Sequence, residues 1–556
     1  MTELLVVLVV ALVVIAGASV VGPRLRVAAP LLLVAVGVLA SFVPALAGVQ
    51  VEPDWILEGV LPPLLYAAAV SMPTMNFRRE FGAISGLSVV LVVLSAVVLG
   101  LFFSAAVPGL TLAYGVALGA IISPTDAVAT SIVKQTPTSR RVVAMLDGES
   151  LLNDATALVL LGTATLAATQ AFSFWGTVGD FAWSIVVAVV LGTGVGAVNL
   201  LVRRRITDPT VNTVISFAVP FVASLPATLL GASGLVAAVV AGLLTGVLAP
   251  RHLSPQNRLS DSQNWRTVEL VLEGAVFLTM GLQISSIVTD VERDHAGVGT
   301  AVLVAAGALV LVLLVRAAYV VPLLVFLSRM AQRGQQLRDR LEEFQSSMGT
   351  PEGRRESFEA VNRGRRPRSE RDVDRFASRV TRVLADIEYF RRQPLGWRDG
   401  TVVVWAGMRG AVTVAAAQTL PEDTPQRLLL VLVAFAVAAL SLLLQGGTVG
   451  ALVHRLGPST DPAEVERQEA AERDRITELV RTTTAALPAP PHPDGPPTGE
   501  QFVAAKEHRL AVIAAQRSAL LDARDHGTFD AELLEHALAN LDAAQISLEM
   551  RSSLAV

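Results

Sequence analysis

Long apolar runs alternate with short polar connections along most of this 556-residue chain. A run of about 20 apolar residues can cross the hydrocarbon core of a bilayer as a helix. These runs are apolar on all sides and rich in Gly and Ala, so the pattern predicts an all-α polytopic membrane protein. Thirteen spans are expected, near residues 3–21, 27–47, 55–75, 83–106, 110–133, 143–169, 174–202, 210–230, 232–249, 267–289, 298–328, 401–419 and 427–453.

Basic residues are concentrated in every second connection, and Lys and Arg in short loops stay cytoplasmic. The bias predicts an outside N-terminus, a cytoplasmic C-terminus and an odd number of spans. We read the first run as a retained helix because it lacks a basic n-region, although the small residues at 16–19 leave cleavage open. The basic connections contain Arg24 and Arg26; Arg78 and Arg79; Lys134, Arg140 and Arg141; Arg203 to Arg205; and Arg251, Arg258 and Arg266, whereas the opposite connections contain only Arg293 and Arg427.

Two charged blocks interrupt this pattern and divide the chain into domains. Residues 1–455 form the expected membrane domain, with a charged cytoplasmic insertion at 329–400, and residues 456–556 form a cytosolic helical tail. We expect helices at 372–392, 461–486 and 500–549, the last two separated by a Pro-rich linker at 488–497. Solvated loops are favoured over an anionic-lipid site for the basic clusters at 353–355 and 364–368, and a packed helical hairpin is favoured over a regulatory site for the tail.

Composition narrows the function. The chain is 52% hydrophobic, has a mean hydropathy of +0.56 and carries a net charge of only −4, which says nothing about partners. The absence of Cys excludes disulfides and thiolate metal sites, and seven scattered His offer no metal-ligand pair. Without a His-centred base, a nucleophile elbow or a metal triad, we expect neither an enzyme nor a cofactor, and no nucleic-acid partner.

Polar residues enter the sixth span in the segment Gly-Glu-Ser-Leu-Leu-Asn-Asp at 148–154. Ionisable groups at membrane depth are costly and by default indicate a functional site. On a helix, Glu149 and Asn153 share a face, as do Ser150 and Asp154, so several oxygens can face a small cation. The alternative is an ordinary capped helix N-terminus, which suits 147–150 better than Asn153 and Asp154.

Two further spans carry helix-breaking residues. In the fifth, Pro124 disfavours helix at Ser123, and Asp126 follows the predicted break. In the twelfth, Gly407 and Gly410 flank Arg409, which either neutralises opposed half-helix ends or forms a structural ion pair. Breaks in spans 5 and 12 fit two inverted six-helix repeats with span 7 as a linker, the sequence pattern of a secondary transporter.

Buried charges in spans 10 and 11 need partners. Glu269 and Glu273 are one helical turn apart in span 10, and Arg316 lies well inside span 11. An unpaired buried Arg is strongly unfavourable, so we expect Arg316 to pair with Glu149 or Glu273. That pairing leaves Asp126 and Asp154 free to bind a cation or a proton.

Three segments together closely resemble the signatures of the monovalent cation/proton antiporters, the sodium/proton exchanger superfamily. They are 123–129 (Ser-Pro-Thr-Asp-Ala-Val-Ala), 148–154 and 407–411 (Gly-Met-Arg-Gly-Ala), and weaker likenesses occur at 61–66 and 273–281. The resemblance spans residues 1–455. It implies a homodimer with a dimerisation domain and a mobile core, working by elevator-like alternating access. The chain departs from the family pattern in two places. Residues 67–69 are all Ala where many relatives have an acidic residue, and the loop at 329–400 is enlarged.

The resemblance also assigns roles to residues. It implies that Asp154 carries the cation or the proton, that Na⁺ binds at Asp154 and Asp126, and that Glu149 pairs with Arg316. The Asn153-Asp154 pair resembles the electroneutral branch, which exchanges one cation for one proton. The remaining assignments are Thr125, Ser150 and Asn153 as completing the ion site, Arg409 as the charge at the broken helix, and Glu273 as a further candidate.

The sequence therefore predicts a multi-pass Na⁺/H⁺ antiporter of the cytoplasmic membrane, serving pH homeostasis and embedded in lipid as a homodimer. The oxygens that would contact the ion do not by themselves select it, so K⁺/H⁺ exchange (or Li⁺ as a substrate) stays open. A tail-regulated cation channel is the alternative from another class. Broken helices in two repeats favour a carrier, and the sequence has no carbonyl filter of the TVGYG type.

Overall fold

The computed structural model describes residues 2–25, 27–43, 52–169, 174–293, 297–347, 350–361, 369–457, 462–488 and 499–553. All regular structure in these ranges is helical, which confirms the expected fold class. Nine helices within them are long and apolar enough to cross a membrane, and three shorter apolar helices accompany them. The count of thirteen and the inverted repeats stay predictions.

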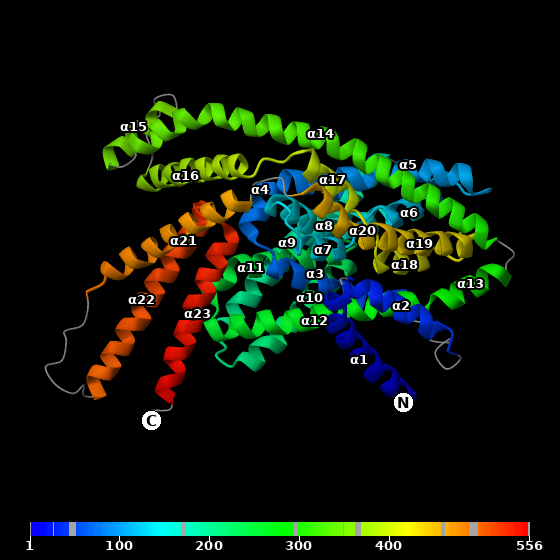
Figure 1. Ribbon diagram of the computed structural model, residues 1–556, viewed down its shortest axis with the longest axis horizontal. Coiled ribbons are helices and arrows are strands. Elements are labelled where there is room, and N and C mark those ends of the chain that lie inside the picture. Colours follow the sequence, from blue (N-terminus) through cyan, green and yellow to red (C-terminus); the bar gives the residue numbers. More distant parts are fainter. Residues whose placement is uncertain are drawn as a thin grey trace. The chain divides into compact units, whose positions relative to one another are not determined.

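The chain divides into two compact units, each described by itself (Figure 1). The membrane unit comprises residues 1–253, 257–323 and 396–459, and the charged unit comprises 254–256, 324–395 and 460–556. The membrane unit contains α1 (Thr2–Leu25), α2 (Ala29–Ser41), η1 (Trp55–Val60), α3 (Leu61–Ser71), α4 (Thr74–Ser85), η2 (Gly86–Val90), α5 (Leu91–Ala106), α6 (Leu112–Ile122), α7 (Val128–Lys134), α8 (Arg140–Thr169), α9 (Phe174–Arg203), α10 (Pro209–Leu229), α11 (Gly234–His252), α12 (Pro255–Leu282), α13 (Ile284–Arg293), the first part of α14 (Val298–Ser347), α17 (Trp397–Trp405), α18 (Ala411–Gln418), α19 (Arg427–Ser441), η3 (Leu442–Gly446) and α20 (Gly447–Leu456).

Two expected spans are interrupted where the sequence places its breaks. The fifth ends as α6 at Ile122 and resumes as α7 at Val128, around Pro124. The twelfth ends as α17 at Trp405 and resumes as α18 at Ala411, around the glycines. Each break leaves backbone carbonyls and amides without helical partners inside an apolar unit, so other groups must satisfy them.

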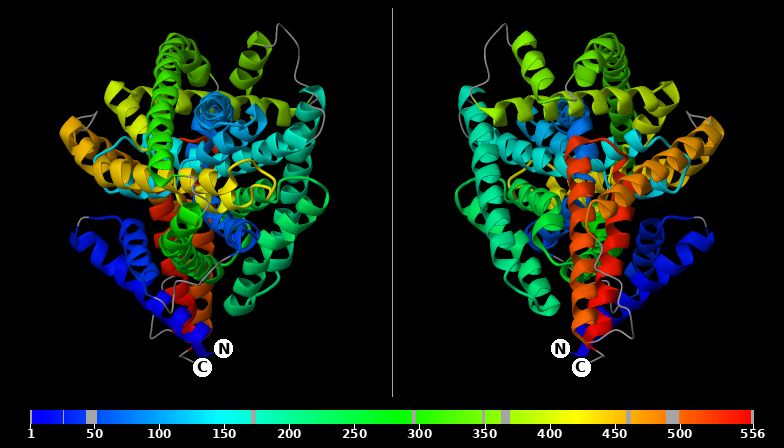
Figure 2. Two further views of the ribbon diagram at one scale, coloured as in Figure 1. Left: turned by 90° about the vertical axis from the view of Figure 1, so that its right-hand side faces the viewer. Right: turned by 90° about the vertical axis from the view of Figure 1, so that its left-hand side faces the viewer.

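One group of helices in the membrane unit is built around Tyr66 and Trp265. Their rings lie 5.0 Å apart, and small residues of α9, α10 and α11 pack against them. The helices α9, α10 and α11 lie side by side, as both views in Figure 2 show. We call α3 and α9 to α12 the scaffold group.

The second group contains both broken helices, with α5, α8 and α19 packed around them. We call α4 to α8, the membrane part of α14 and α17 to α20 the site group. An apolar cluster joins the two groups where α3 and α11 meet α8. Its buried members include Leu65 of α3, Val239 of α11, and Leu151 and Ala155 of α8.

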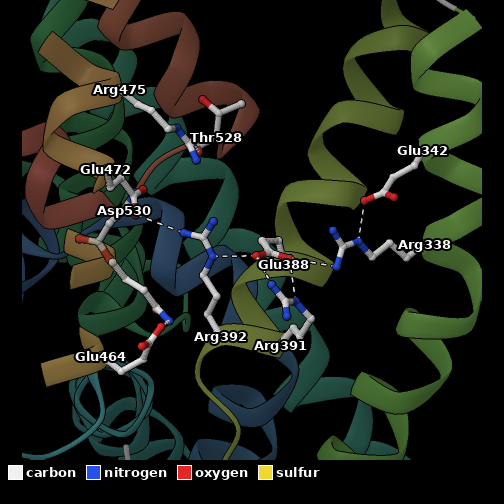
Figure 3. A network of polar contacts seen from close by, with 11 residues as sticks. Arg338, Glu342, Glu388, Arg391, Arg392, Glu464, Glu472, Arg475, Thr528 and Asp530 are labelled. Carbon is white, nitrogen blue, oxygen red and sulfur yellow. Dashed lines mark hydrogen bonds and ion pairs between the residues drawn. The ribbon is translucent and has the colours of Figure 1, made fainter. Parts of the chain in front are cut away.

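The charged unit combines the insertion with the tail. It contains the end of α14, α15 (Pro351–Val361), α16 (Glu370–Arg392), α21 (Pro462–Ala485), α22 (Gly499–His526) and α23 (Ala531–Ser553). Figure 3 shows how α16 meets α21: Arg392 contacts Glu388 at 2.8 Å and Glu472 at 3.3 Å, and Glu472 accepts the Asp530 N–H at 2.5 Å.

The helical stretch expected at 500–549 is divided into two helices. Gly527 has a φ of 71°, which ends α22 with a left-handed residue. Asp530 then caps α23, since its Oδ1 accepts the Glu532 N–H at 3.0 Å. The tail helices pack through an apolar cluster that includes Ile476, Leu521 and Leu534.

Candidate ion-binding site

The two breaks cross one another inside the membrane unit. The Asp126 N–H donates to the Met408 carbonyl at 2.8 Å, which joins the first break to the second. Arg409 Nε donates to the Ile122 carbonyl at 2.9 Å, and one of its terminal nitrogens donates to the Ser123 carbonyl at 3.4 Å. The guanidinium therefore covers the carbonyl end of α6, where the helix dipole is negative.

The glycines of the second break, Gly407 and Gly410, make room for charged side chains. A Cβ built on Gly410 would lie 1.3 Å from Asp126 Oδ2, and one built on Gly407 would lie 2.6 Å from Arg316 Nε. Both distances are shorter than any ordinary van der Waals contact. A side chain at position 410 would have to displace the Asp126 carboxylate. These glycines therefore admit a carboxylate and a guanidinium as well as weakening the helix.

Glu149 and Arg316 form a buried ion pair. Arg316 donates from both terminal nitrogens to the two oxygens of Glu149, one of them at 2.7 Å, and its Nε donates to the Val403 carbonyl at 2.9 Å. Both side chains are only 2% exposed. Of the two partners that the sequence leaves open for Arg316, the structure places Glu149 against it.

Thr125 and Asn153 connect that ion pair to the first break. The Thr125 hydroxyl donates to Glu149 Oε1 at 3.2 Å, and Asn153 Nδ2 donates to the Thr125 hydroxyl at 2.8 Å and to its carbonyl at 3.1 Å. Asn153 Oδ1 is buried and has no hydrogen-bond partner among the described residues. This amide holds the broken backbone in place and leaves one oxygen available for a ligand.

Asp154 differs from the other charged residues of the crossing. Among the residues that the structure describes, no hydrogen bond or ion pair is formed by its carboxylate, which opens on a small cavity also lined by Ile121, Pro124, Val412 and Ala416. Nearly all of this lining is apolar. A carboxylate in such a place can be neutralised by a proton or a small cation, and both are therefore candidate ligands.

The remaining predicted residues lie at or near the crossing. Asp126 Oδ1 accepts the Val128 N–H at 2.9 Å, so this carboxylate satisfies the first backbone donor of α7. The Ser150 hydroxyl donates to the Asp147 carbonyl of its own helix at 3.1 Å. Glu273 lies on α12, within electrostatic range of Asp126 and one turn after Glu269.

Several polar contacts around the site were not predicted. Ser441 of α19 accepts the Arg409 N–H at 2.9 Å, a contact whose only signal is a hydroxyl inside an apolar span. Glu80 and Arg141 form a buried pair at 2.6 Å between α4 and α8. Lys134 pairs with Asp147 at 2.9 Å, which connects α7 to α8. In the described ranges, no group of three or more His, Cys, Asp or Glu side chains could hold a metal ion.

This arrangement defines a class of protein. Two broken helices that cross inside a helical membrane unit, with a carboxylate beside the crossing, are the architecture of a secondary transporter. The sequence model described as the transmembrane domain of sodium/hydrogen exchangers matches residues 8–354 and 375–455. The chain therefore belongs to the sodium/hydrogen exchanger family, a family of monovalent cation/proton antiporters, as its motifs predicted.

Individual relatives agree with this assignment. An uncharacterized Na⁺/H⁺ exchanger of Mycobacterium tuberculosis is 28% identical over 482 residues, which cover 85% of this chain and 77% of that protein. The Na⁺/H⁺ antiporter ApNhaP of Aphanothece halophytica is 26% identical over 469 residues, covering 83% and 76%. The sodium proton antiporter MjNhaP1 of Methanocaldococcus jannaschii shares the fold at a TM-score of 0.54 and 15% identity, covering 82% of this chain and 99% of that one.

Proposed function

We propose that this protein exchanges Na⁺ for H⁺ across the cytoplasmic membrane, and that the two ions compete for Asp154. The observation that carries the proposal is the difference between Asp154 and its neighbours. Glu149 is held by Arg316, and Asp126 accepts the first backbone N–H of α7, whereas in the described part of the chain no hydrogen bond or ion pair engages Asp154. The family and its Na⁺/H⁺ exchanging relatives support Na⁺ as the cation.

The charges at the crossing support a one-to-one exchange. Glu149 and Arg316 cancel, and Asp126 and Arg409 bring opposite charges to the same crossing. The Asn153 amide does not bind a proton at physiological pH. The carboxylate of Asp154 therefore supplies the one charge that is neutralised by either a proton or Na⁺. The site is then neutral with either Na⁺ or H⁺ bound, and the cycle moves no net charge.

Obligatory exchange follows from the cost of an uncompensated charge in a medium of low dielectric. The empty, ionised site would carry a bare carboxylate through that medium, which costs several kcal/mol. Only the Na⁺-bound and the protonated forms move between the two sides. No separate gate is needed to couple the two fluxes.

We propose an elevator-like movement of the site group against the scaffold group. Part of the surface between them is an apolar cluster that includes Leu65, Leu151 and Val239. Sliding such surfaces breaks no polar contacts within the cluster, and its dispersion contacts can re-form in a new register. The proposal includes the thirteen spans in two inverted repeats, an outside N-terminus, a cytoplasmic C-terminus and a homodimer, supported by the loop charges and by the motifs.

The test uses Asp154→Asn in reconstituted vesicles with an internal pH dye. We expect Na⁺-driven proton movement to fall to the level of empty vesicles, because Asn binds neither a proton nor a cation at this site. The matched control is Asp147→Asn, two turns earlier on α8, where the carboxylate is already paired with Lys134. Exchange at wild-type rates in folded Asp154→Asn protein would refute the assignment.

The same vesicles separate the alternative functions. Varying Na⁺, K⁺ and Li⁺ one at a time identifies the substrate, and a larger response to K⁺ would replace Na⁺ in the proposal. Clamping the membrane potential with valinomycin and K⁺ tests the stoichiometry, since an electroneutral cycle does not respond to potential. Unsaturable flux or single-channel currents would favour the channel.

A further inference from the structure

A polar bridge joins the site group to the scaffold group at the end of the second broken helix. Gln418, the last residue of α18, donates from Nε2 to Gln283 Oε1 at 2.8 Å. Gln283 is 6% exposed and lies between the end of α12 at Leu282 and the start of α13 at Ile284. The bridge therefore connects a half-helix of the ion site to a scaffold helix.

The half-helix α18 forms one wall of the ion site. Asp126 packs against Gly410 just before α18, and Val412 and Ala416 of α18 line the cavity at Asp154. Eight residues of helix span about 12 Å, so α18 carries this wall from the crossing to the bridge. Val412 and Ala416 lie on one face of α18. Gln418 is rotated from Ala416 by about 200° around the helix axis, so its side chain extends from another face.

The partner of the bridge is fixed to the scaffold group. Asp261 of α12 pairs with Arg203 of α9 at 2.9 Å, and Trp265 of α12 donates to the Ser216 hydroxyl of α10 at 2.9 Å. These contacts hold the first half of α12 in the scaffold, and the helix continues without a break to Leu282, next to Gln283. The following helix, α13, packs against α19 of the site group, so Gln283 lies at the boundary between the two groups. A movement of the site group against the scaffold therefore has to stretch or break the contact between Gln283 and Gln418.

We propose that Gln283 and Gln418 form a reversible latch that positions α18 in the conformation seen here and must open in each transport cycle. The inference rests on the proposed function, because it needs the two groups to move. Two neutral amides suit this role: a neutral hydrogen bond is easily exchanged for water, whereas a separated buried ion pair would leave bare charges. In the predicted topology, the latch lies on the outer half of the membrane unit.

A single-cysteine reporter tests the latch. The chain has no Cys, so Ala416→Cys places a unique thiol on the cavity wall. A membrane-impermeant thiol reagent is applied from the outside. We expect Gln418→Leu to raise the labelling rate of Cys at position 416 about threefold to tenfold, because the free energy of one neutral hydrogen bond changes an equilibrium by about that factor. The matched control is Gln426→Leu, whose amide bonds Pro108 within the site group. Unchanged labelling in both Gln418→Leu and Gln283→Leu would overturn the latch.

A cross-link gives an independent readout. We expect a short bifunctional methanethiosulfonate joining Gln283→Cys to Gln418→Cys to stop exchange, and dithiothreitol to restore it. The control joins Thr213→Cys to Asn264→Cys, a hydrogen-bonded scaffold pair that need not separate. Continued exchange in cross-linked protein overturns the latch alone, whereas absence of cation/proton exchange in the wild type overturns the proposed function.

Discussion

Removing Arg316 should destabilise the protein rather than simply inactivate it. In Arg316→Met, the Glu149 carboxylate loses both guanidinium hydrogen bonds and keeps the Thr125 hydroxyl at 3.2 Å. The pair is 2% exposed on each side, so little water can replace the lost partner. Breaking a buried pair by removing one member costs about 3–5 kcal/mol. That is a large share of the roughly 5–15 kcal/mol that stabilises a typical protein.

Thermal unfolding of the detergent-solubilised protein, followed by size-exclusion chromatography, measures this loss. We expect a clearly lower unfolding temperature and less folded protein for Arg316→Met. The double variant with Glu149→Gln should recover part of the loss, because the remaining buried group is then neutral. An unfolding temperature equal to that of the wild type in Arg316→Met would refute the structural role of the pair. Asp154→Asn is the contrast, with normal unfolding and lost exchange.

Two other positions give separate predictions. Gly410→Ala should reduce exchange more than Gly407→Ala does. A Cβ at position 410 would overlap the Asp126 carboxylate, whereas a Cβ at position 407 would contact the side chain of Arg316. Equal exchange rates of the two variants in vesicles would contradict this prediction. In the charged unit, the hydrogen bonds that Arg391 and Arg392 donate to Glu388 lower the pKa of this carboxyl to about 2. The pairing of Glu388 therefore contributes stability that is lost as the pH falls from about 4.5 towards 2. Glu388→Gln should make the acid unfolding of the full chain, followed by tryptophan fluorescence, less dependent on pH over that range.

Much of the fold could be predicted from residues that are close together in the sequence. Runs of about 20 apolar residues predict spans in any context, and Pro124 disfavours helix at Ser123 whatever surrounds it. Both helix interruptions are therefore predictable from neighbouring residues. The turn at Gly527 was equally local, since a glycine followed by an Asp cap ends one helix and starts another, but the long helical pattern at 500–549 concealed it.

Pairing between distant residues needed the tertiary structure. The sequence allowed Arg316 to form an ion pair with either Glu149 or Glu273. For Arg409 it allowed two roles, neutralising the half-helix ends or forming a structural ion pair. In the structure, Arg316 contacts Glu149, 167 positions away, and Arg409 donates to the carbonyls of Ile122 and Ser123. Such choices depend on which helices pack together, and one chain's spacing does not encode that directly.

The sequence by itself determined the apolar helical class, the two breaks and the short set of polar residues that interrupt the apolar runs, because each follows from the cost of placing polar groups or breaking helices in an apolar medium. Only the tertiary structure decided which of those residues hold one another. It satisfies Glu149 and Asp126 and leaves Asp154 facing a cavity. That distinction arises from crossing helices, since a carboxylate is paired or free according to the neighbours that packing brings to it.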